Sequence, residues 1–265
     1  MSLRRTFLFA CLSVPLIFMS VHAAEPVRVR VLTYNIHHGG GMDGKLDLAR
    51  IADVIKRLSP DIVALQEVDK STRRSQGVDQ AAELGKLTGM HHEFGKAMDY
   101  AGGEYGEAIL SKYPLTAVQV HPLPFTDGSE PRCALAARIK LGANGPEIMF
   151  VGTHLEHAKS TLRLCQSNKL NPLLLANNSL PTILAGDLND VPDSPTIQVL
   201  KAHWQDASAQ DPAPTSPSRQ PKRKIDYVLY RPVKGWHVVE QQVVAEPVAS
   251  DHCPLLVVLE WRGAR

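Results

Sequence analysis

Residues 27–35 read Val-Arg-Val-Arg-Val-Leu-Thr-Tyr-Asn, and the stretch His-His-Gly-Gly-Gly follows at residues 37–41. Valine alternates with arginine at first, and β-favouring residues complete the run, which predicts a strand with two different faces. The glycines predict a loop directly after this strand. Asn35 would therefore stand where a strand enters a loop, a position at which folds commonly present functional side chains.

The segment after this loop, residues 45–58, carries apolar residues three or four positions apart, which predicts one face of a helix. These residues are Leu48, Ile51, Ile55 and Leu58. Ser59-Pro60 ends the pattern. Residues 62–65 are apolar and predict a short buried strand that ends at Gln66-Glu67.

The rest of the chain is richer in strands than in helices. Strands are expected at residues 91–97, 106–111, 115–120, 133–141, 147–154, 182–185, 225–230, 236–244 and 254–260. Helices are expected at 78–87, from Lys159 with an interruption at Pro172, and at 196–201, and the proline-rich residues 206–221 predict a loop. Two sheets packed face to face with helices outside would bury such runs, and we predict one domain over residues 24–265.

The composition is close to that of an average globular protein, with 265 residues, 44% apolar and 21% charged. It excludes a disordered, collagen-like or disulfide-framework protein. The formal net charge is only +2. Because no strong basic surplus exists, any phosphate chemistry must depend on a local site.

The first 23 residues predict a signal peptide. Arg4-Arg5 precede an apolar run at residues 7–19, and small residues around Ala23 predict cleavage there. An uncleaved anchor is the alternative. We expect export to the periplasm or the medium, by the general secretory or the twin-arginine route. Cleavage removes two arginines and no acid, so the mature chain would have 27 basic and 27 acidic residues.

Three cysteines would remain after cleavage: Cys133, Cys165 and Cys253. An odd number allows at most one disulfide within the chain. We expect the three to behave as core residues, because a free cysteine packs as a small hydrophobe.

Polar residues that can handle phosphate or metal stand at the ends of several predicted strands: Asn35, Glu67, His154, Asp187, Asn189, Asp226, Asp251 and His252. Taken singly, each has a structural interpretation, such as a turn residue, a salt-bridge partner, a helix cap or a core histidine. Taken together, they are expected to gather at one edge of packed sheets, where sites are usually built.

These stretches resemble motifs of the endonuclease/exonuclease/phosphatase superfamily, the deoxyribonuclease-I-like phosphoesterases. The matching motifs are Thr33-Tyr34-Asn35, Leu65-Gln66-Glu67, Ala108-Ile109-Leu110-Ser111, Gly152-Thr153-His154-Leu155, Gly186-Asp187-Leu188-Asn189, Ile225-Asp226-Tyr227 and Ser250-Asp251-His252-Cys253-Pro254. The resemblance implies an α+β fold, a four-layer α/β/β/α sandwich of two mixed, largely antiparallel sheets with outer helices. It also implies a hydrolase of phosphoester bonds that requires Mg²⁺ or Mn²⁺.

Carried over by position, Asn35 and Glu67 would hold the divalent metal, with Asp251 on it or near it. Oxygen ligands suit Mg²⁺, which keeps several waters and lets a substrate phosphate complete its shell. The metal would polarise the phosphoryl group and stabilise the leaving oxygen.

The same resemblance assigns the remaining site residues to catalysis. His252 would work with Asp226, whose carboxylate orients and charges the imidazole. Asp187 would position or deprotonate the attacking water, and the choice of base between Asp187 and the Asp226–His252 pair stays open. Asn189 and His154 would donate hydrogen bonds to the phosphoryl oxygens, as substrate-binding as well as catalytic residues.

Two further residues qualify the resemblance. Arg132, in Glu130-Pro131-Arg132, would either bind the substrate phosphate or brace the site through a salt bridge. Glu107 stands where many relatives carry asparagine or another neutral residue. An added acid there would repel phosphate or recruit a second cation, so it bears on both the pocket and the metal count.

Two weaker features are a basic run and two histidine pairs. The basic run, Arg219, Lys222, Arg223 and Lys224, would either draw an anionic substrate or membrane surface or form a solvated loop. The adjacent pairs His37-His38 and His91-His92 are expected to point opposite ways and so not to chelate a metal together.

The substrate is not determined by these motifs. A neutral mature chain favours a phosphodiesterase acting on a small molecule or a lipid headgroup, because nuclease affinity rests on neutralising many phosphates. An exported nuclease acting on DNA or RNA is one alternative, and a non-catalytic phosphate-binding module is another. The expected partners are a phosphoester substrate, with nucleic acid or membrane lipid as options, no partner protein, and a monomeric state.

Overall fold

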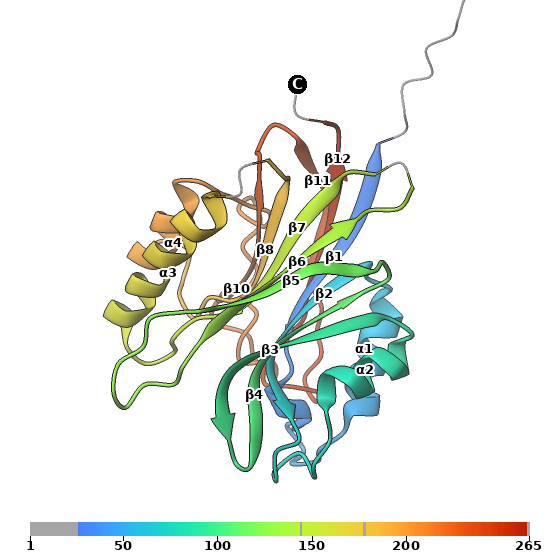
Figure 1. The fold of residues 1–265 in the computed structure, drawn as a ribbon, viewed down its shortest axis with the longest axis vertical. Helices are drawn as coiled ribbons and strands as arrows, with labels where there is room; N and C mark the ends of the chain where they lie inside the picture. Colours follow the sequence, from blue (N-terminus) through green and yellow to red (C-terminus); the bar gives the residue numbers. More distant parts are fainter. Residues whose placement is uncertain (1–25, 144, 177–178, 264–265) are drawn as a thin grey trace, which may run out of the picture.

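The computed structural model describes residues 26–143, 145–176 and 179–263, which contain two six-stranded sheets (Figure 1). The first sheet has the order β11 (Trp236–Val243), β12 (Leu255–Trp261), β1 (Val27–Asn35), β2 (Ile62–Lys70), β4 (Gly103–Ser111) and β3 (His91–Tyr100). The second has the order β5 (Leu115–Pro122), β6 (Cys133–Lys140), β7 (Glu147–His154), β8 (Thr182–Asp187), β10 (Asp226–Arg231) and β9 (Gln205–Asp206). The β1–β2 and β7–β8 pairs are parallel and the other pairs antiparallel, which confirms mixed, largely antiparallel sheets.

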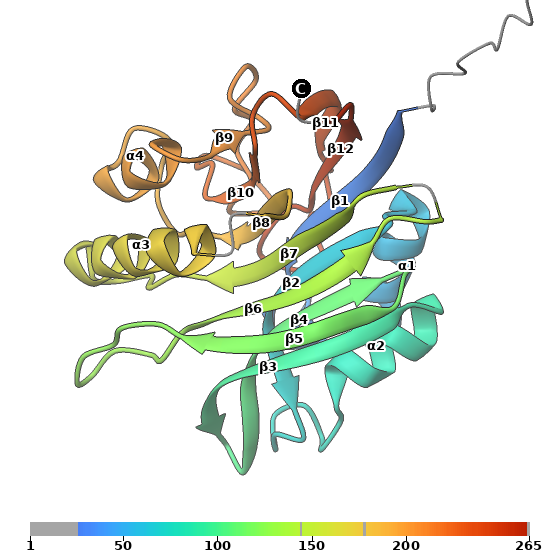
Figure 2. The same ribbon diagram turned by 45° about the horizontal axis from the view of Figure 1, so that its top comes forward.

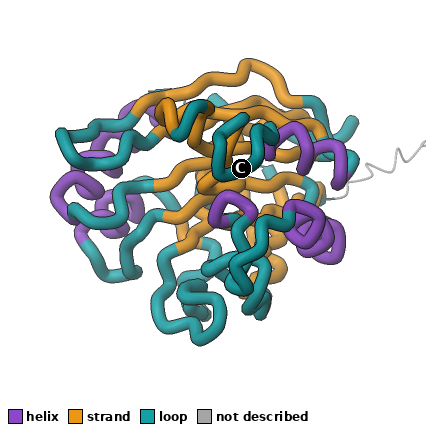
Figure 3. Tube along the Cα trace, turned by 90° about the horizontal axis from the view of Figure 1, so that it is seen from below, coloured by secondary structure: helices purple, strands orange, loops and turns teal. Residues whose placement is uncertain are grey.

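Helices cover the outer face of each sheet, as Figures 2 and 3 show from two further directions. The first sheet carries α1 (Leu48–Leu58) and α2 (Gln80–Thr88), and the second carries α3 (Ser160–Leu175) and α4 (Pro195–Lys201). The helix α1 begins where the Asp47 side chain accepts a hydrogen bond from Arg50 N, and it ends at left-handed Ser59. The predicted α/β/β/α sandwich is therefore confirmed.

Successive side chains of a strand point to opposite faces of its sheet, so one strand contributes both to the core between the sheets and to the core under the helices. In β1, Val29 and Val31 point into the core between the sheets, whereas Leu32 and Tyr34 pack toward the helices. The alternation places Asn35 in the same row as Val29 and Val31, at the end of the strand. The site begins where the apolar row between the sheets gives way to polar residues.

Two element boundaries differ from the sequence-based expectation. The strand β2 does not end at Glu67 but continues to Lys70 through a register shift between Leu65 and Val68. The helix α3 is not interrupted at Pro172 but continues to Leu175. Leu174, beyond the proline, is buried against the second sheet, and this packing offsets the hydrogen bond that the proline cannot donate.

The three described cysteines are free thiols. Cys133 and Cys253 are buried as expected, but the expectation was wrong for Cys165, which is exposed on α3. The predicted signal peptide, residues 1–23, lies outside the described residues. Among the helices of the described chain, none combines the length and apolar character needed to cross a membrane.

Candidate active site

The candidate site lies where inward-facing rows of both sheets become polar. Asn35 continues the row of Val31 in β1, and the second sheet contributes three equivalent positions. These are His154 after Phe150 in β7, Asp187 after Ala185 in β8, and Asp226 before Val228 in β10. Alternation in the strands thus places four predicted site residues between the sheets at one end of the sandwich.

A pocket of about 510 Å³ opens at this end of the sandwich. Its walls are Glu67, Arg74, Met98, Tyr100, Tyr105, Glu130, Arg132, His154, His157, Asp187, Asn189, Asp251 and His252. The predicted gathering of strand-end residues at one edge is therefore present in the fold. Asn35 and Asp226 are buried directly behind these walls through their contacts with Glu67, Asp187 and His252.

Glu67 reaches the site through a β-bulge. Val63, Leu65 and Val68 all pack toward α1 and α2, so the bulge shifts the helix-facing row by one residue. Glu67 adopts a left-handed conformation with a φ of 59°, which is uncommon for a residue other than glycine. Without the bulge, alternation would direct Glu67 toward the helices, away from Asn35.

The Asn35 amide connects two carboxylates. Its Nδ2 donates to Glu67 Oε1 at 3.0 Å and to Asp187 Oδ2 at 3.2 Å, and its Oδ1 accepts from His37 N at 3.0 Å. Ser250 Oγ donates to the backbone carbonyl of Asn35 at 2.7 Å, which ties this strand end to the segment that carries Asp251. The carboxylates of Glu67 and Asp187 therefore meet at the Asn35 amide nitrogen, beside the segment that carries Asp251.

This donor set fits a divalent cation that prefers oxygen. Glu67 and Asp251 both line the pocket, and within the described residues neither forms an ion pair with a lysine or arginine. Carboxylates without a cationic partner repel one another in a partly buried site, and a divalent cation removes that repulsion.

Asp226 and His252 form a buried pair. His252 Nδ1 lies 2.9 Å from Asp226 Oδ2, and the other ring nitrogen, Nε2, lies 3.7 Å from Asp187 Oδ2. Burial lowers the pKa of His252, but the negative charges of Asp226 and Asp187 outweigh it and raise the pKa to about 10. The ring is therefore a cation at neutral pH, held between two carboxylates.

Asp187 lies at the centre of the site. Burial and the nearby charge of Asp226 raise its pKa to about 7, although His252 and the hydrogen bonds from Asn189 N and Asn35 oppose this rise. The backbone N–H of Asn189 donates to Asp187 Oδ1 at 2.9 Å, and Asn189 has a left-handed φ of 53°. The turn after β8 thus fixes the carboxylate and the Asn189 amide together.

His154 is held from both sides. Arg132 Nη1 donates to His154 Nδ1 at 2.8 Å, and because a guanidinium has no acceptor, the ring proton lies on Nε2. The Nε2 proton can be donated to Asp187 Oδ2, 3.5 Å away, whereas Asn189 Nδ2, 2.9 Å away, is itself a donor and donates to the carbonyl oxygen of Leu155. Burial and the charge of Arg132 lower the pKa of His154 well below its usual range, so the ring is neutral.

Arg132 itself is buried, and its hydrogen bonds are structural. Its Nη2 donates to Glu130 Oε2 at 3.2 Å, and Nη1 fixes His154. These contacts correspond to the bracing alternative predicted from the sequence. The side chain still borders the pocket.

Glu107 faces the core between the sheets from β4, on the inward row of Ile109, and is not part of the pocket wall. It is fully buried, and neither carboxyl oxygen has a hydrogen-bond partner among the described residues. Burial raises the pKa of this carboxyl well above its usual range, and the positive charge of Arg132 offsets only part of that rise. Glu107 is therefore a neutral acid beneath the site.

The basic run before Asp226 is divided by the fold. Arg219, Lys222 and Arg223 are exposed, but Lys224 is buried in an ion pair with Asp206 at 3.0 Å. The interpretation of Lys224 as part of an exposed basic patch was therefore wrong.

Five pocket residues were not named in the sequence analysis: Arg74, Met98, Tyr100, Tyr105 and His157. Tyr105 lies two residues before Glu107 in the same strand, and His157 follows His154 by three residues. Proximity to a motif was therefore an available signal for these two. Arg74 and Tyr100 offered none, because Arg74 is placed by its salt bridge with Asp69 and by stacking on the Tyr100 ring at the end of β3.

The two-sheet fold, with polar residues at the strand ends, is that of the deoxyribonuclease-I-like superfamily. A sequence model described as the endonuclease/exonuclease/phosphatase family matches residues 32–252, and the chain belongs to that family. Members of the family are phosphoester hydrolases and typically depend on a divalent metal.

Individual relatives agree with this assignment. The chain is 29% identical to the Escherichia coli K12 protein YbhP, described as uncharacterized, over 180 residues, which are 61% of this chain and 66% of YbhP. The match thus spans just under two thirds of that relative. An endonuclease/exonuclease/phosphatase from Beutenbergia cavernae is 26% identical, with a TM-score of 0.75 over 90% of this chain and 72% of that one. A mannosyl-6-phosphatase from Bacteroides thetaiotaomicron is 19% identical, with a TM-score of 0.73 over 87% and 99%, and shares the fold.

Proposed function

We propose that this protein is a metal-dependent phosphodiesterase that hydrolyses a small or lipid-headgroup phosphodiester. The observation that carries the proposal is the shared position of Asp187. It contacts the Asn35–Glu67 oxygen cluster on one side and faces the Asp226–His252 pair on the other. One carboxylate thus borders both a cation site and a buried proton-binding pair, as hydrolysis of a phosphoester requires.

Asn35, Glu67 and Asp251 would hold the divalent ion, Mg²⁺ or Mn²⁺. When bound, such an ion polarises a phosphoryl oxygen and neutralises the charge that develops on the leaving group. Glu67 is directed to this place by its bulge, and the Ser250 hydroxyl ties the Asp251 segment to β1.

The other residues act on the substrate directly. Asp187 positions the attacking water and accepts its proton. The Nε2 protons of His154 and His252, with the Asn189 amide, provide hydrogen bonds to a phosphoryl oxygen as its charge increases. Arg132 keeps His154 in the tautomer that can donate from Nε2.

The form of the pocket supports a small substrate. It has a volume of about 510 Å³, and Glu67, Glu130, Asp187 and Asp251 all contribute carboxylates to its lining. A nucleic acid binds to an extended cationic surface, and acidic side chains at the centre of a site repel its phosphates. That a mannosyl-6-phosphatase shares this fold supports the idea that it accommodates a small phosphorylated molecule. Nuclease activity remains the alternative outcome of the test.

The test is hydrolysis by the purified protein, before and after treatment with EDTA. The substrates are bis(p-nitrophenyl) phosphate, p-nitrophenyl phosphate, phospholipid vesicles, plasmid DNA and RNA. We expect turnover of the diester that stops with EDTA and returns with Mg²⁺ or Mn²⁺. Turnover that ignores the chelator contradicts the metal mechanism, and preference for nucleic acid contradicts the substrate class. Binding of phosphate compounds with no turnover of any substrate indicates a binding module instead.

A further inference from the structure

A cluster of nitrogen ligands lies beside Glu67. One ring nitrogen of His37, one of His38 and one carboxylate oxygen of Glu67 all lie within 4.8 Å of one another. The expectation that adjacent histidines point apart was therefore wrong for this pair. It assumed the alternation of a strand, but His37 and His38 both have a left-handed φ of 46° within the short 3₁₀ turn His37–Gly39.

One nitrogen of the His37 ring is fixed by a hydrogen bond within the turn. Its Nδ1 lies 3.0 Å from the carbonyl oxygen of Gly40, and since a carbonyl only accepts, Nδ1 carries the proton. The lone pair is therefore on Nε2. Metal-binding histidines usually donate their second ring nitrogen to a carbonyl or carboxylate in this way, because the contact fixes the tautomer and the ring.

The His38 ring contributes a nitrogen without a partner. Its Nδ1 is buried and has no hydrogen-bond partner among the described residues. The backbone of this residue is fixed, because Gln80 Nε2 donates to the His38 carbonyl oxygen at 2.7 Å. A buried polar atom without a partner costs free energy, and a bound cation would satisfy it.

The turn that carries both histidines is held in a conformation with an energetic cost. Successive left-handed residues other than glycine are rare, and each costs on the order of 1–2 kcal/mol. Asn35 Oδ1 accepts from His37 N and so holds the start of the turn. Gly39 follows with a φ of 74°, and an added Cβ there would lie 2.9 Å from Leu48 Cδ2, so the turn packs directly on α1.

We propose that His37, His38 and Glu67 form a binding site for a divalent transition metal of the zinc class. Two imidazoles and one carboxylate are the ligand types that Zn²⁺ and similar ions prefer, whereas Mg²⁺ prefers oxygen alone. Arg74 places a positive charge near His38, but it is paired in two hydrogen bonds with Asp69, and Asp69 and Asp251 add negative charge there. The site shares Glu67 with the oxygen cluster of Asn35 but does not depend on the proposed hydrolysis.

The experiment measures zinc binding without any substrate. Chelator-treated protein carrying Cys165→Ser, which removes the exposed thiol, is titrated with Zn²⁺ in excess Mg²⁺ by calorimetry. We expect one zinc ion per chain, with an affinity at least about 10-fold weaker in His37→Asn and in His38→Asn, since loss of a ligand exceeds the usual effect of an outer contact. Asparagine tolerates a left-handed conformation, so the turn is kept, and circular dichroism verifies the fold.

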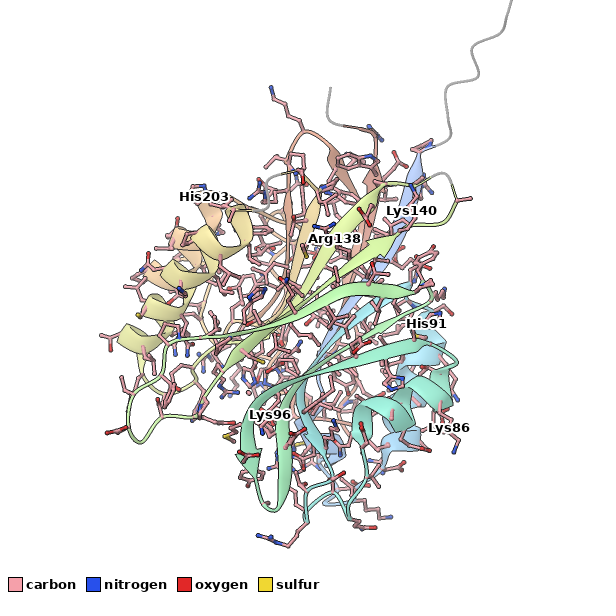
Figure 4. All side chains as sticks on the ribbon, viewed as in Figure 1. Lys86, His91, Lys96, Arg138, Lys140 and His203 are labelled. Carbon is pink, nitrogen blue, oxygen red and sulfur yellow. The ribbon has the colours of Figure 1, made fainter. Side chains whose placement is uncertain are left out.

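The matched control is His91→Ala. His91 is exposed at the start of β3, at the end of that strand remote from Lys96 (Figure 4), and its loss should leave zinc affinity unchanged. In protein that keeps both histidines, NMR of ¹⁵N-labelled histidine should show shifts of the His37 and His38 ring signals when zinc is added. Unchanged affinity in either asparagine variant, an equal loss in His91→Ala, or displacement of zinc by Mg²⁺ overturns the proposal. A failure here leaves the hydrolysis proposal intact, because turnover is not part of this measurement.

Discussion

His252 Nδ1 lies 2.9 Å from Asp226 Oδ2, and both side chains are almost completely buried. The two residues belong to different segments, the strand β10 and the loop before β12. Their contact is the main reason that the His252 pKa is raised to about 10 in spite of burial. The charge of this ring therefore depends mainly on a carboxylate that does not line the pocket, with a smaller contribution from Asp187.

Replacement of Asp226 by asparagine should lower the pKa of His252 from about 10 toward its ordinary 6.5. NMR titration of the ring protons in metal-free protein measures this, with exposed His91 as an internal reference. A raised pKa adds stability that is fully present below pH 6.5 and is lost as pH rises through 10. The advantage of the unmodified protein over Asp226→Asn should therefore disappear across that window. An unchanged midpoint for His252 would show that Asp226 does not set its charge.

Asp187→Asn should separate activity from stability. We expect hydrolysis to fall by at least about 10², as for a lost acid–base group. The pKa of Asp187 is raised from 3.8 to about 7, so its contribution to stability is present below pH 3.8 and lost as pH rises through 7. Asparagine has no such loss, so its melting temperature relative to the unmodified protein should rise as pH goes from about 4 to about 7 and then stay constant at higher pH. Asp193→Asn, in the loop before α4, is the control for both measurements.

Sequence reasoning placed Asn35, His154, Asp187 and Asp226 at one edge because alternation within a strand is a local property. Each follows or precedes an apolar inward row that can be read directly from the chain. Their roles in the reaction stay predictions until variants are measured.

Glu67 shows where that reasoning ends. Its face depends on a bulge, and the bulge depends on the register between β2 and β4, strands about 40 residues apart in sequence. Lys224 is a similar case, because a run of basic residues predicts solvent exposure, and only the tertiary fold reveals the buried partner Asp206. Contacts between segments far apart in the sequence could not be predicted from the local residue pattern.

Glu107→Gln should stabilise the fold with a characteristic pH dependence. The pKa of this buried acid is raised well above 4.5 by burial. Its contribution to the free energy of unfolding is fully present below pH 4.5 and is lost as pH rises through the raised pKa. Glutamine stays neutral, and its gain in melting temperature should grow with pH. Thermal unfolding across pH 5–9 measures it. The exposed Glu147→Gln, at the start of β7, should show no such trend, and a flat difference for Glu107→Gln would refute a neutral buried acid.

Lys224→Met should destabilise the protein strongly. Lys224 Nζ lies 3.0 Å from Asp206 Oδ2 and 3.3 Å from the centre of the Tyr227 ring, and both charged side chains are nearly inaccessible. Removal of the lysine leaves a buried carboxylate without its cation, which costs about 3–5 kcal/mol in the free energy of unfolding. Urea denaturation measures the loss, and the exposed Lys222→Met should stay within about 0.5 kcal/mol of the unmodified protein. The double variant Lys224→Met/Asp206→Asn removes both charges and keeps an acceptor for the Ser208 contacts, so it should recover much of the stability. A double variant no more stable than Lys224→Met would mean that packing of the lysine, and not its charge, stabilises this region.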